Sequence, residues 1–219
     1  MLKLLKATNK TKKIFQQVKI RCALSKRDFT FEATDLGAGN SEGKNNYKKI
    51  SKIVHRETLP FSAALIMSVW AKKKKAKKIL ELGTSLGLTT SVLAAITNAE
   101  ITSIEGDPVL QRFARFTARK TGVEDKIHFI LGDFDHYLEK LMQSTQFDII
   151  FVDGNHTYQA TMRYFRIISR LQPSGTIVIF DDINWSEGMR KAWKEIKNSS
   201  ETKVIFNFVR TGIIKIIKK

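Results

Sequence analysis

The chain has 219 residues, 42% of them hydrophobic and 27% charged, which is ordinary for a globular protein and suits one domain with an added segment. No apolar run reaches the ~20 residues that span a bilayer, and lysines interrupt any secretory signal over residues 1–6. A single cysteine, Cys22, excludes an internal disulfide and a thiolate metal cluster. We therefore expect a cytoplasmic protein without a transmembrane segment.

The net charge of +17 at pH 7 has two interpretations. Such a charge attracts nucleic acid, acidic lipid or an anionic substrate, but a lysine-rich solvated surface gives the same composition. The basic residues are mostly lysines, spread over both ends of the chain and the run 72–78, without the interleaved aromatic residues that stack on bases. Nucleic-acid binding is therefore the secondary interpretation.

Residues 1–78 are interpreted as a basic, helical N-terminal extension and a loop, and residues 79–219 as the core domain. Apolar residues at helical spacing over 1–30 predict amphipathic helices that pack on the core, form a homodimer or lie on a membrane, with the first two favoured. A further helical segment, 47–78, divides near Pro60. The glycine-rich stretch 35–40 is followed by polar, loop-forming residues, and no strand ending in an acid follows it, so we predict a loop there.

From residue 79 onward, predicted strands and helices alternate. The strands are predicted at 79–83, 101–105, 127–131, 147–152 and 176–181, and the helices at 86–97, 108–120, 135–143, 157–171 and 187–197. Two further strands, 203–208 and 212–217, form a terminal pair. Continuous apolar runs such as 147–152 are typical of buried parallel strands. The pattern predicts a doubly wound α/β fold with a mostly parallel sheet of seven strands.

A glycine-bearing turn, Gly83–Gly87, joins the first of these strands to its helix. Glycines at both ends of the turn let the backbone approach a ligand, and backbone N–H groups at a helix N-terminus favour one. The second strand ends in Glu105, about 20 residues further on, which is where such folds hydrogen-bond a ribose diol. The two features together predict a nucleoside ligand.

The segment Glu81–Gly87 resembles the first motif, E/D-x-G-x-G-x-G, of class I S-adenosylmethionine-dependent methyltransferases. Ser85 replaces the middle glycine, as is familiar in the catechol and caffeoyl-CoA O-methyltransferase branch. The resemblance covers roughly residues 79–219 and implies a Rossmann-like fold with S-adenosylmethionine as cofactor. The residues that it implies for the cofactor site are Glu81, Gly83, Thr84, Ser85, Gly87, Glu105, Gly106, Asp133, Phe134 and Asp153.

Two of these residues have specific implied contacts. Glu105 would bind both ribose hydroxyls, and Asp133 would accept a hydrogen bond from the adenine amino group beside the ring of Phe134. The alternative for Asp133 is that it caps the helix that begins there.

Three carboxylates, Asp153, Asp181 and Asp182, follow two strands that should be neighbours in the sheet. Converging unpaired carboxylates repel one another, and a divalent cation such as Mg²⁺, which prefers oxygen ligands, would relieve the repulsion. In the resembling catechol-type enzymes, an Asp and an Asp-Asn pair hold a cation at these positions. Asp182 stands where that branch has Asn. Both alternatives, a bound metal and a site without one, therefore stay open. If a metal binds, Asn184 is a candidate to replace the missing asparagine ligand.

His156 lies three residues after Asp153, where the same branch has a lysine base. An imidazole can take a proton from an acceptor hydroxyl at neutral pH, so His156 and Asp153 are the candidate catalytic residues. The alternative is that His156 only orders the turn or caps the following helix.

The resemblance implies a methyltransferase that acts on a hydroxyl of a small molecule, with or without Mg²⁺. Two alternatives stay open: an RNA methyltransferase, favoured by the charge, and a non-catalytic binding module with the same fold.

Overall fold

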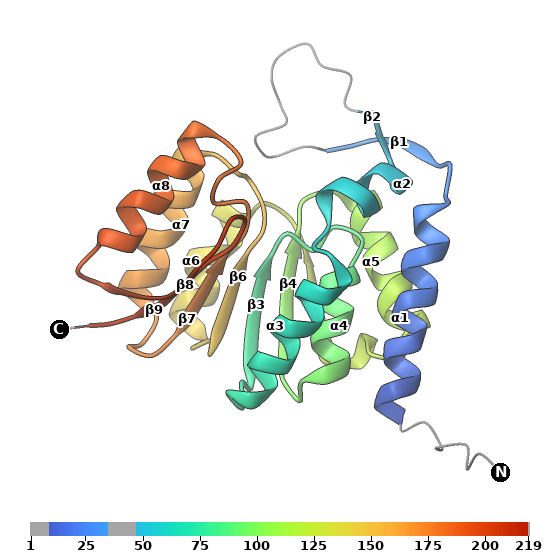
Figure 1. Ribbon diagram of the computed structural model, residues 1–219, viewed down its shortest axis with the longest axis horizontal. Helices are drawn as coiled ribbons and strands as arrows, with labels where there is room; N and C mark the ends of the chain where they lie inside the picture. The colour runs from blue at the N-terminus through green and yellow to red at the C-terminus, as the bar shows by residue number, and fades with distance from the viewer. Residues whose placement is uncertain (1–8, 35–46, 219) are drawn as a thin grey trace.

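The computed structural model describes residues 9–34 and 47–218 of the chain, so the predicted loop at 35–40 lies outside the described residues. Within the described part a seven-stranded sheet forms the centre of the molecule, with helices on both faces (Figure 1). The strands follow one another in the order β5-β4-β3-β6-β7-β9-β8. Their bounds are β3 (Lys78–Leu82), β4 (Glu100–Glu105), β5 (Ile127–Leu131), β6 (Ile149–Val152), β7 (Ile177–Phe180), β8 (Thr202–Asn207) and β9 (Gly212–Ile216).

Strands β3 to β7 pair in parallel, and β9 pairs antiparallel with both β7 and β8. Because β9 follows β8 in the chain but lies between β7 and β8 in the sheet, the two strands enter the sheet as a hairpin. This arrangement confirms the predicted doubly wound, mostly parallel fold.

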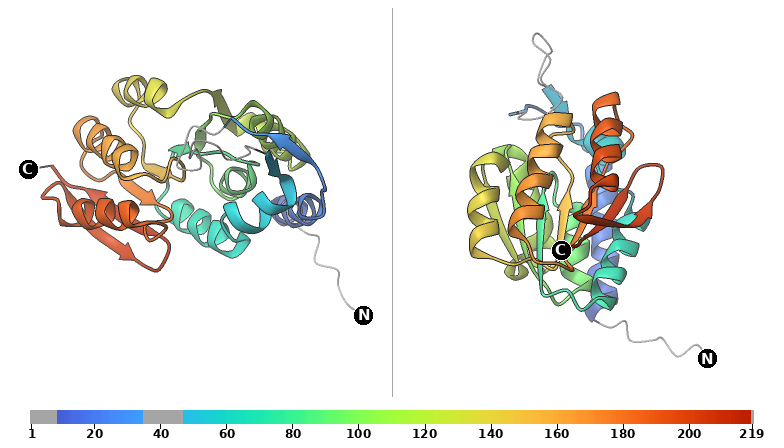
Figure 2. Two further views of the ribbon diagram at one scale, coloured as in Figure 1. Left: turned by 90° about the horizontal axis from the view of Figure 1, so that it is seen from above. Right: turned by 90° about the vertical axis from the view of Figure 1, so that its left-hand side faces the viewer.

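The core consists of two hydrophobic layers, one on each face of the sheet. In β6, Ile149 and Phe151 belong to one layer, whereas Ile150 and Val152 belong to the other, which explains why this strand is apolar throughout. Figure 2 shows the helices on the two sides of the sheet. The first layer is covered by α3 (Phe61–Lys73), α4 (Leu88–Ile96) and α5 (Pro108–Lys120), and the second by α6 (Phe134–Ser144), α7 (Tyr158–Leu171) and α8 (Glu187–Asn198).

The N-terminal helix α1 (Asn9–Ser25) lies against α4 and α5 (Figure 1). Its Ile20 and Leu24 are buried in a third hydrophobic cluster together with Leu86 and Leu88 at the start of α4. The same helix leaves Phe15 exposed. In the described residues α1 therefore packs on the core; the homodimer and the domain boundary after residue 78 stay predictions.

The segment before the core differs from the predicted helical pair. Residues Tyr47–Lys49 form strand β2, which pairs antiparallel with β1 (Thr30–Glu32), and a short helical stretch, α2 (Ile50–Lys52) continuing into a π-helical turn (Ile53–Glu57), follows. The division near Pro60 is correct, because Pro60 is the N-cap residue of α3. None of the helices that the structure describes is both long and apolar enough to cross a membrane.

Candidate functional site

The predicted site residues lie at the carboxyl ends of the parallel strands β3 to β7, the upper edge of the sheet in Figure 1. Ligands of open α/β sheets bind at this edge. The strand order brings the turn after β3 between the ends of β4 and β6, so the two halves of the predicted site are neighbours.

The two glycines of the turn after β3 are required because other parts of the chain lie too close to them to leave room for a side chain. Gly83 has a φ of +100°, and a Cβ there would lie 2.0 Å from the carbonyl oxygen of Asp153. Gly87 has a φ of +69°, and its Cβ would lie 2.7 Å from the Cα of Ala114 on α5. These contacts explain the glycines without a ligand; the predicted contact with the cofactor stays a prediction.

Glu81 lies fully buried beneath the turn. Its Oε2 accepts hydrogen bonds from Thr90 Oγ1 and Ser103 Oγ, both at 2.5 Å, and its Oε1 has no hydrogen-bond partner among the described residues. Burial raises the pKa of Glu81 to about 7, and the two hydroxyl donors oppose that rise. The structure therefore gives Glu81 a position inside the fold, supporting the turn from below.

We expect the free energy of unfolding to fall as the pH rises from 4.5 to about 7, because Glu81 has a pKa of about 7 when folded against an ordinary value of 4.5. Between these values the folded state holds the extra proton, so raising the pH removes stability, by about 3 kcal/mol in all. Urea denaturation of the wild type and Glu81→Gln across this range measures the effect. The variant should lack this part of the slope, and equal slopes in the two proteins would contradict the assignment.

Glu105 joins the turn to the end of β4. Its Oε2 accepts a hydrogen bond from the backbone N–H of Ser85 at 2.6 Å, and its Oε1 accepts one from Asp107 N at 2.9 Å. Burial raises the pKa of Glu105, which is 8% exposed. Ser85 has a φ of +50°, the left-handed conformation that a glycine adopts without cost. The hydrogen bond to Glu105 therefore stabilises a strained conformation at the position where the motif has glycine.

The N-terminal extension contacts the same region. Asp107 is the N-cap of α5, and its Oδ2 also accepts a hydrogen bond from Thr34 N at 2.6 Å. Because Gly106 lies between Glu105 and Asp107, the segment after β1 is placed next to the predicted ribose site.

Asp133 and Phe134 lie at the end of β5. The Asp133 side chain accepts a hydrogen bond from Asp135 N at 2.9 Å, so the helix-capping alternative is present in the structure. The ring of Phe134 packs beside Gly154, where an added Cβ would lie 2.7 Å from Phe134 Cε2. Phe134 is thereby placed between the ends of β5 and β6, and the adenine contacts of both residues stay predictions.

The structure brings Asp153, Asp181, Asp182 and His156 together at the ends of β6 and β7, as predicted. His156 Nε2 lies 3.8 Å from Asp153 Oδ1 and 3.9 Å from Asp182 Oδ2. A residue that the sequence analysis missed, Arg210, lies among them. It belongs to the turn between β8 and β9, which was predicted only as a hairpin turn.

Arg210 binds both neighbouring aspartates. Its Nε lies 3.0 and 2.9 Å from Oδ1 and Oδ2 of Asp181, and its Nη2 lies 2.6 Å from Oδ2. The same Nε lies 3.0 Å from Asp182 Oδ1, and Thr211 Oγ1 donates to Asp181 Oδ1 at 3.2 Å. Burial alone would lower the pKa of Arg210, but its hydrogen bonds with Asp181 and the surrounding carboxylates raise it.

The electrostatics of the remaining groups follow from burial. Desolvation, followed by the charge of Asp181, raises the pKa of Asp153 well above its ordinary value and raises that of Asp182 as well. Desolvation also lowers the pKa of His156, which favours the neutral imidazole. One guanidinium thus faces three carboxyl groups, and burial works against the charged forms of Asp153 and Asp182.

A magnesium ion does not fit this arrangement. Both oxygens of Asp181 and one of Asp182 are already paired with Arg210. Within residues 9–34 and 47–218, no three His, Cys, Asp or Glu side chains are placed to hold a metal ion together. The Nδ2 of Asn184, the substitute ligand, donates to Val209 O at 2.6 Å and holds this side chain against the β8–β9 turn.

Residues 80–183 match the family model described as a methyltransferase domain. The chain is 27% identical to a caffeoyl-CoA O-methyltransferase of Populus kitakamiensis over 58% of this chain and 56% of that protein. It is 29% identical to tapetum-specific methyltransferase 1 of Arabidopsis thaliana over 58% of this chain and 55% of that protein. The matches thus span about half the length of these curated relatives.

Solved structures of O-methyltransferases share the fold of this chain. The O-methyltransferase from Bacillus cereus, solved in complex with SAH, superposes with a TM-score of 0.68 at 16% identity, over 94% of this chain and 90% of that chain. The O-methyltransferase TomG from Streptomyces achromogenes, in complex with SAM, gives a TM-score of 0.66 at 18% identity, over 74% and 82%.

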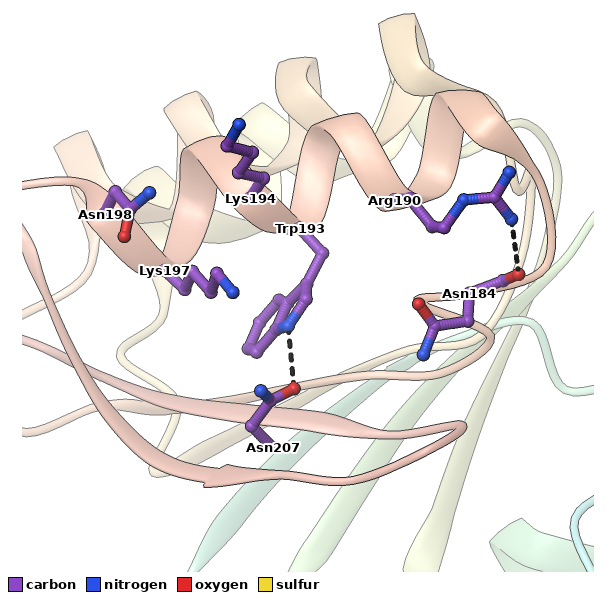
Figure 3. A pocket seen from close by; sticks show the side chains of 7 residues that line it. All are labelled: Asn184, Arg190, Trp193, Lys194, Lys197, Asn198 and Asn207. Atoms are coloured by element: carbon purple, nitrogen blue, oxygen red, sulfur yellow. Dashed lines mark hydrogen bonds between the residues drawn. The ribbon is translucent and has the colours of Figure 1, made fainter.

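A basic pocket of about 440 Å³ lies between α8 and the β8–β9 hairpin (Figure 3). Trp193 forms its inner wall and donates from Nε1 to Asn207 Oδ1 at 2.9 Å. Three cations of α8, Arg190, Lys194 and Lys197, line it. The residues that line the pocket include Asn184 but none of the clustered carboxylates or His156, so this hollow is separate from the carboxylate cluster.

Proposed function

We propose that the chain is an S-adenosylmethionine-dependent methyltransferase that transfers a methyl group to a hydroxyl of a small molecule. One observation carries the proposal: the turn tied to Glu105 lies next to a histidine that is held between carboxylates. The methyltransferase family match and relatives named as O-methyltransferases support it.

S-adenosylmethionine, when bound, supplies an electrophilic methyl group on a sulfonium. The attacking oxygen forms a bond to that methyl carbon while the carbon–sulfur bond breaks, and the hydroxyl proton must leave. His156 Nε2 is the group that takes the proton, and Asp153 and Asp182, 3.8 and 3.9 Å from this nitrogen, stabilise the imidazole once it is charged. Glu105 and the turn at 83–87 hold the nucleoside and methionine parts.

Calorimetry with S-adenosylmethionine tests the cofactor. We expect Glu105→Ala to weaken binding by ~1–3 kcal/mol, because charge-assisted hydrogen bonds to the ribose are lost and the turn loses its anchor at Ser85 N. Glu100→Ala, at the exposed opposite end of β4, is the matched control and should bind as the wild type does. Unchanged affinity in folded Glu105→Ala would remove Glu105 from the site.

Transfer of a labelled methyl group to a panel of catechols and phenols tests the acceptor class. A transcribed RNA belongs in the same panel, because the net charge of +17 favours the RNA alternative. Label in RNA and in none of the phenols would replace the small-molecule proposal. Cofactor binding without transfer to any hydroxyl would favour the non-catalytic module.

A further inference from the structure

The carboxylates at the ends of β6 and β7 have a counter-ion that belongs to the chain itself. The side chain of Asp181 is fully buried, and Arg210 forms a bidentate pair with it and reaches Asp182 as well. Bidentate guanidinium–carboxylate pairs are among the stronger hydrogen-bonded pairs in proteins. Arg210 thus already neutralises the group that a bound cation would need as its central ligand.

The backbone fixes Arg210 in this place. Ile183 N donates to Arg210 O at 3.0 Å, and Asn184 Nδ2 donates to Val209 O at 2.6 Å. The turn that carries the arginine is thereby held against the segment that carries Asp181 and Asp182. Withdrawal of the guanidinium would leave a buried carboxylate unpaired, which is strongly unfavourable.

A divalent cation and Arg210 therefore compete for the same oxygens. Magnesium demands near-octahedral oxygen coordination at short distance, which leaves no room for a guanidinium on the same carboxylate. We propose that Arg210 takes the place of a divalent cation in this methyltransferase site, so that the wild-type chain needs no metal there. Loss of the Arg210 side chain then frees the oxygens of Asp181 and Asp182 for a cation.

Manganese binding, followed by the electron paramagnetic resonance signal of free Mn²⁺, tests the proposal without any assay of methyl transfer. The wild-type chain should bind Mn²⁺ more weakly than about 1 mM, and Arg210→Met should bind one ion at least ~10-fold tighter, because Asp181 and Asp182 have lost the guanidinium that occupies their oxygens. Arg210→Met/Asp181→Asn should lose that ion again. Arg190→Met is the matched control: it removes the same charge from a residue whose guanidinium donates to the carbonyl of Asn184, and it should behave as the wild type.

Micromolar, one-to-one Mn²⁺ binding by the wild type that disappears in Asp181→Asn would overturn the proposal, as would Arg210→Met binding no tighter than Arg190→Met. Should Arg210→Met fail to fold, calorimetry of the wild type with S-adenosylmethionine in EDTA and in Mg²⁺ decides instead: equal affinities support the proposal, and a requirement for Mg²⁺ overturns it. The manganese measurement uses no S-adenosylmethionine, so its result would still be valid if the proposed function were wrong.

Discussion

Gly83→Ala is expected to destabilise the fold by about 4 kcal/mol or more, the range that marks a severe, localised clash. The added methyl group would lie 2.0 Å from the carbonyl oxygen of Asp153, and that oxygen belongs to the backbone at the end of a buried strand. It cannot move aside as a flexible side chain could. The φ of +100° adds the strain that an L-residue meets in this conformation.

Gly175→Ala is the matched control for this prediction. Gly175 has nearly the same φ, +104°, but nothing lies within 4 Å of its added Cβ. Its cost should be limited to backbone strain, about 1–2 kcal/mol. Urea denaturation of the two variants separates strain from contact, and equal losses would show that the Asp153 carbonyl contributes nothing.

His156→Ala is expected to lower turnover by about 10²- to 10⁴-fold, the usual contribution of a general base. Affinity for S-adenosylmethionine should change little, because the contacts of His156 are with Asp153 and Asp182, whereas Glu105 and the turn at 83–87 would hold the cofactor. Initial rates with the acceptor that the panel identifies, together with calorimetry, measure the two effects separately.

His136→Ala removes an exposed histidine on α6 and should leave both quantities unchanged. A drop in cofactor affinity as large as the drop in turnover would instead assign His156 a structural role in the turn. Turnover equal to that of the wild type would exclude it as the base.

The fold was largely predictable because central strands such as β6 and β7 are continuous apolar runs followed by a polar residue. The predictions were wrong at very short strands and where hydrogen-bond partners lie far apart in the sequence. Three-residue strands such as β2 have no periodicity to detect, and no local pattern predicts that the Asp148 side chain accepts from Lys77 N and Lys78 N. Such partners lie about 70 residues apart in the sequence and only the folded chain brings them together.

The sequence predicts which residues lie at the ends of the strands, but it does not predict which hydrogen bonds and ion pairs they form. The carboxylates and His156 follow strand ends, so parallel pairing alone brings them together. The burial of Glu81 depends on Ser103 and Thr90, which come from a neighbouring strand and a helix. Arg210 is an isolated arginine in a hairpin turn, 29 residues from Asp181, and no local pattern marks it as the partner of that residue.

The position of β9 between β7 and β8 has a consequence for how the molecule responds to disturbance. Arg210 stays with the aspartates only while the whole hairpin is docked, and the hairpin docks through β9. Any fluctuation that lifts this pair of strands from β7 would expose the carboxylates without touching the cofactor turn. Docking of the β8–β9 hairpin at the edge of the sheet thus determines whether the aspartates at the ends of the central strands keep their cationic partner.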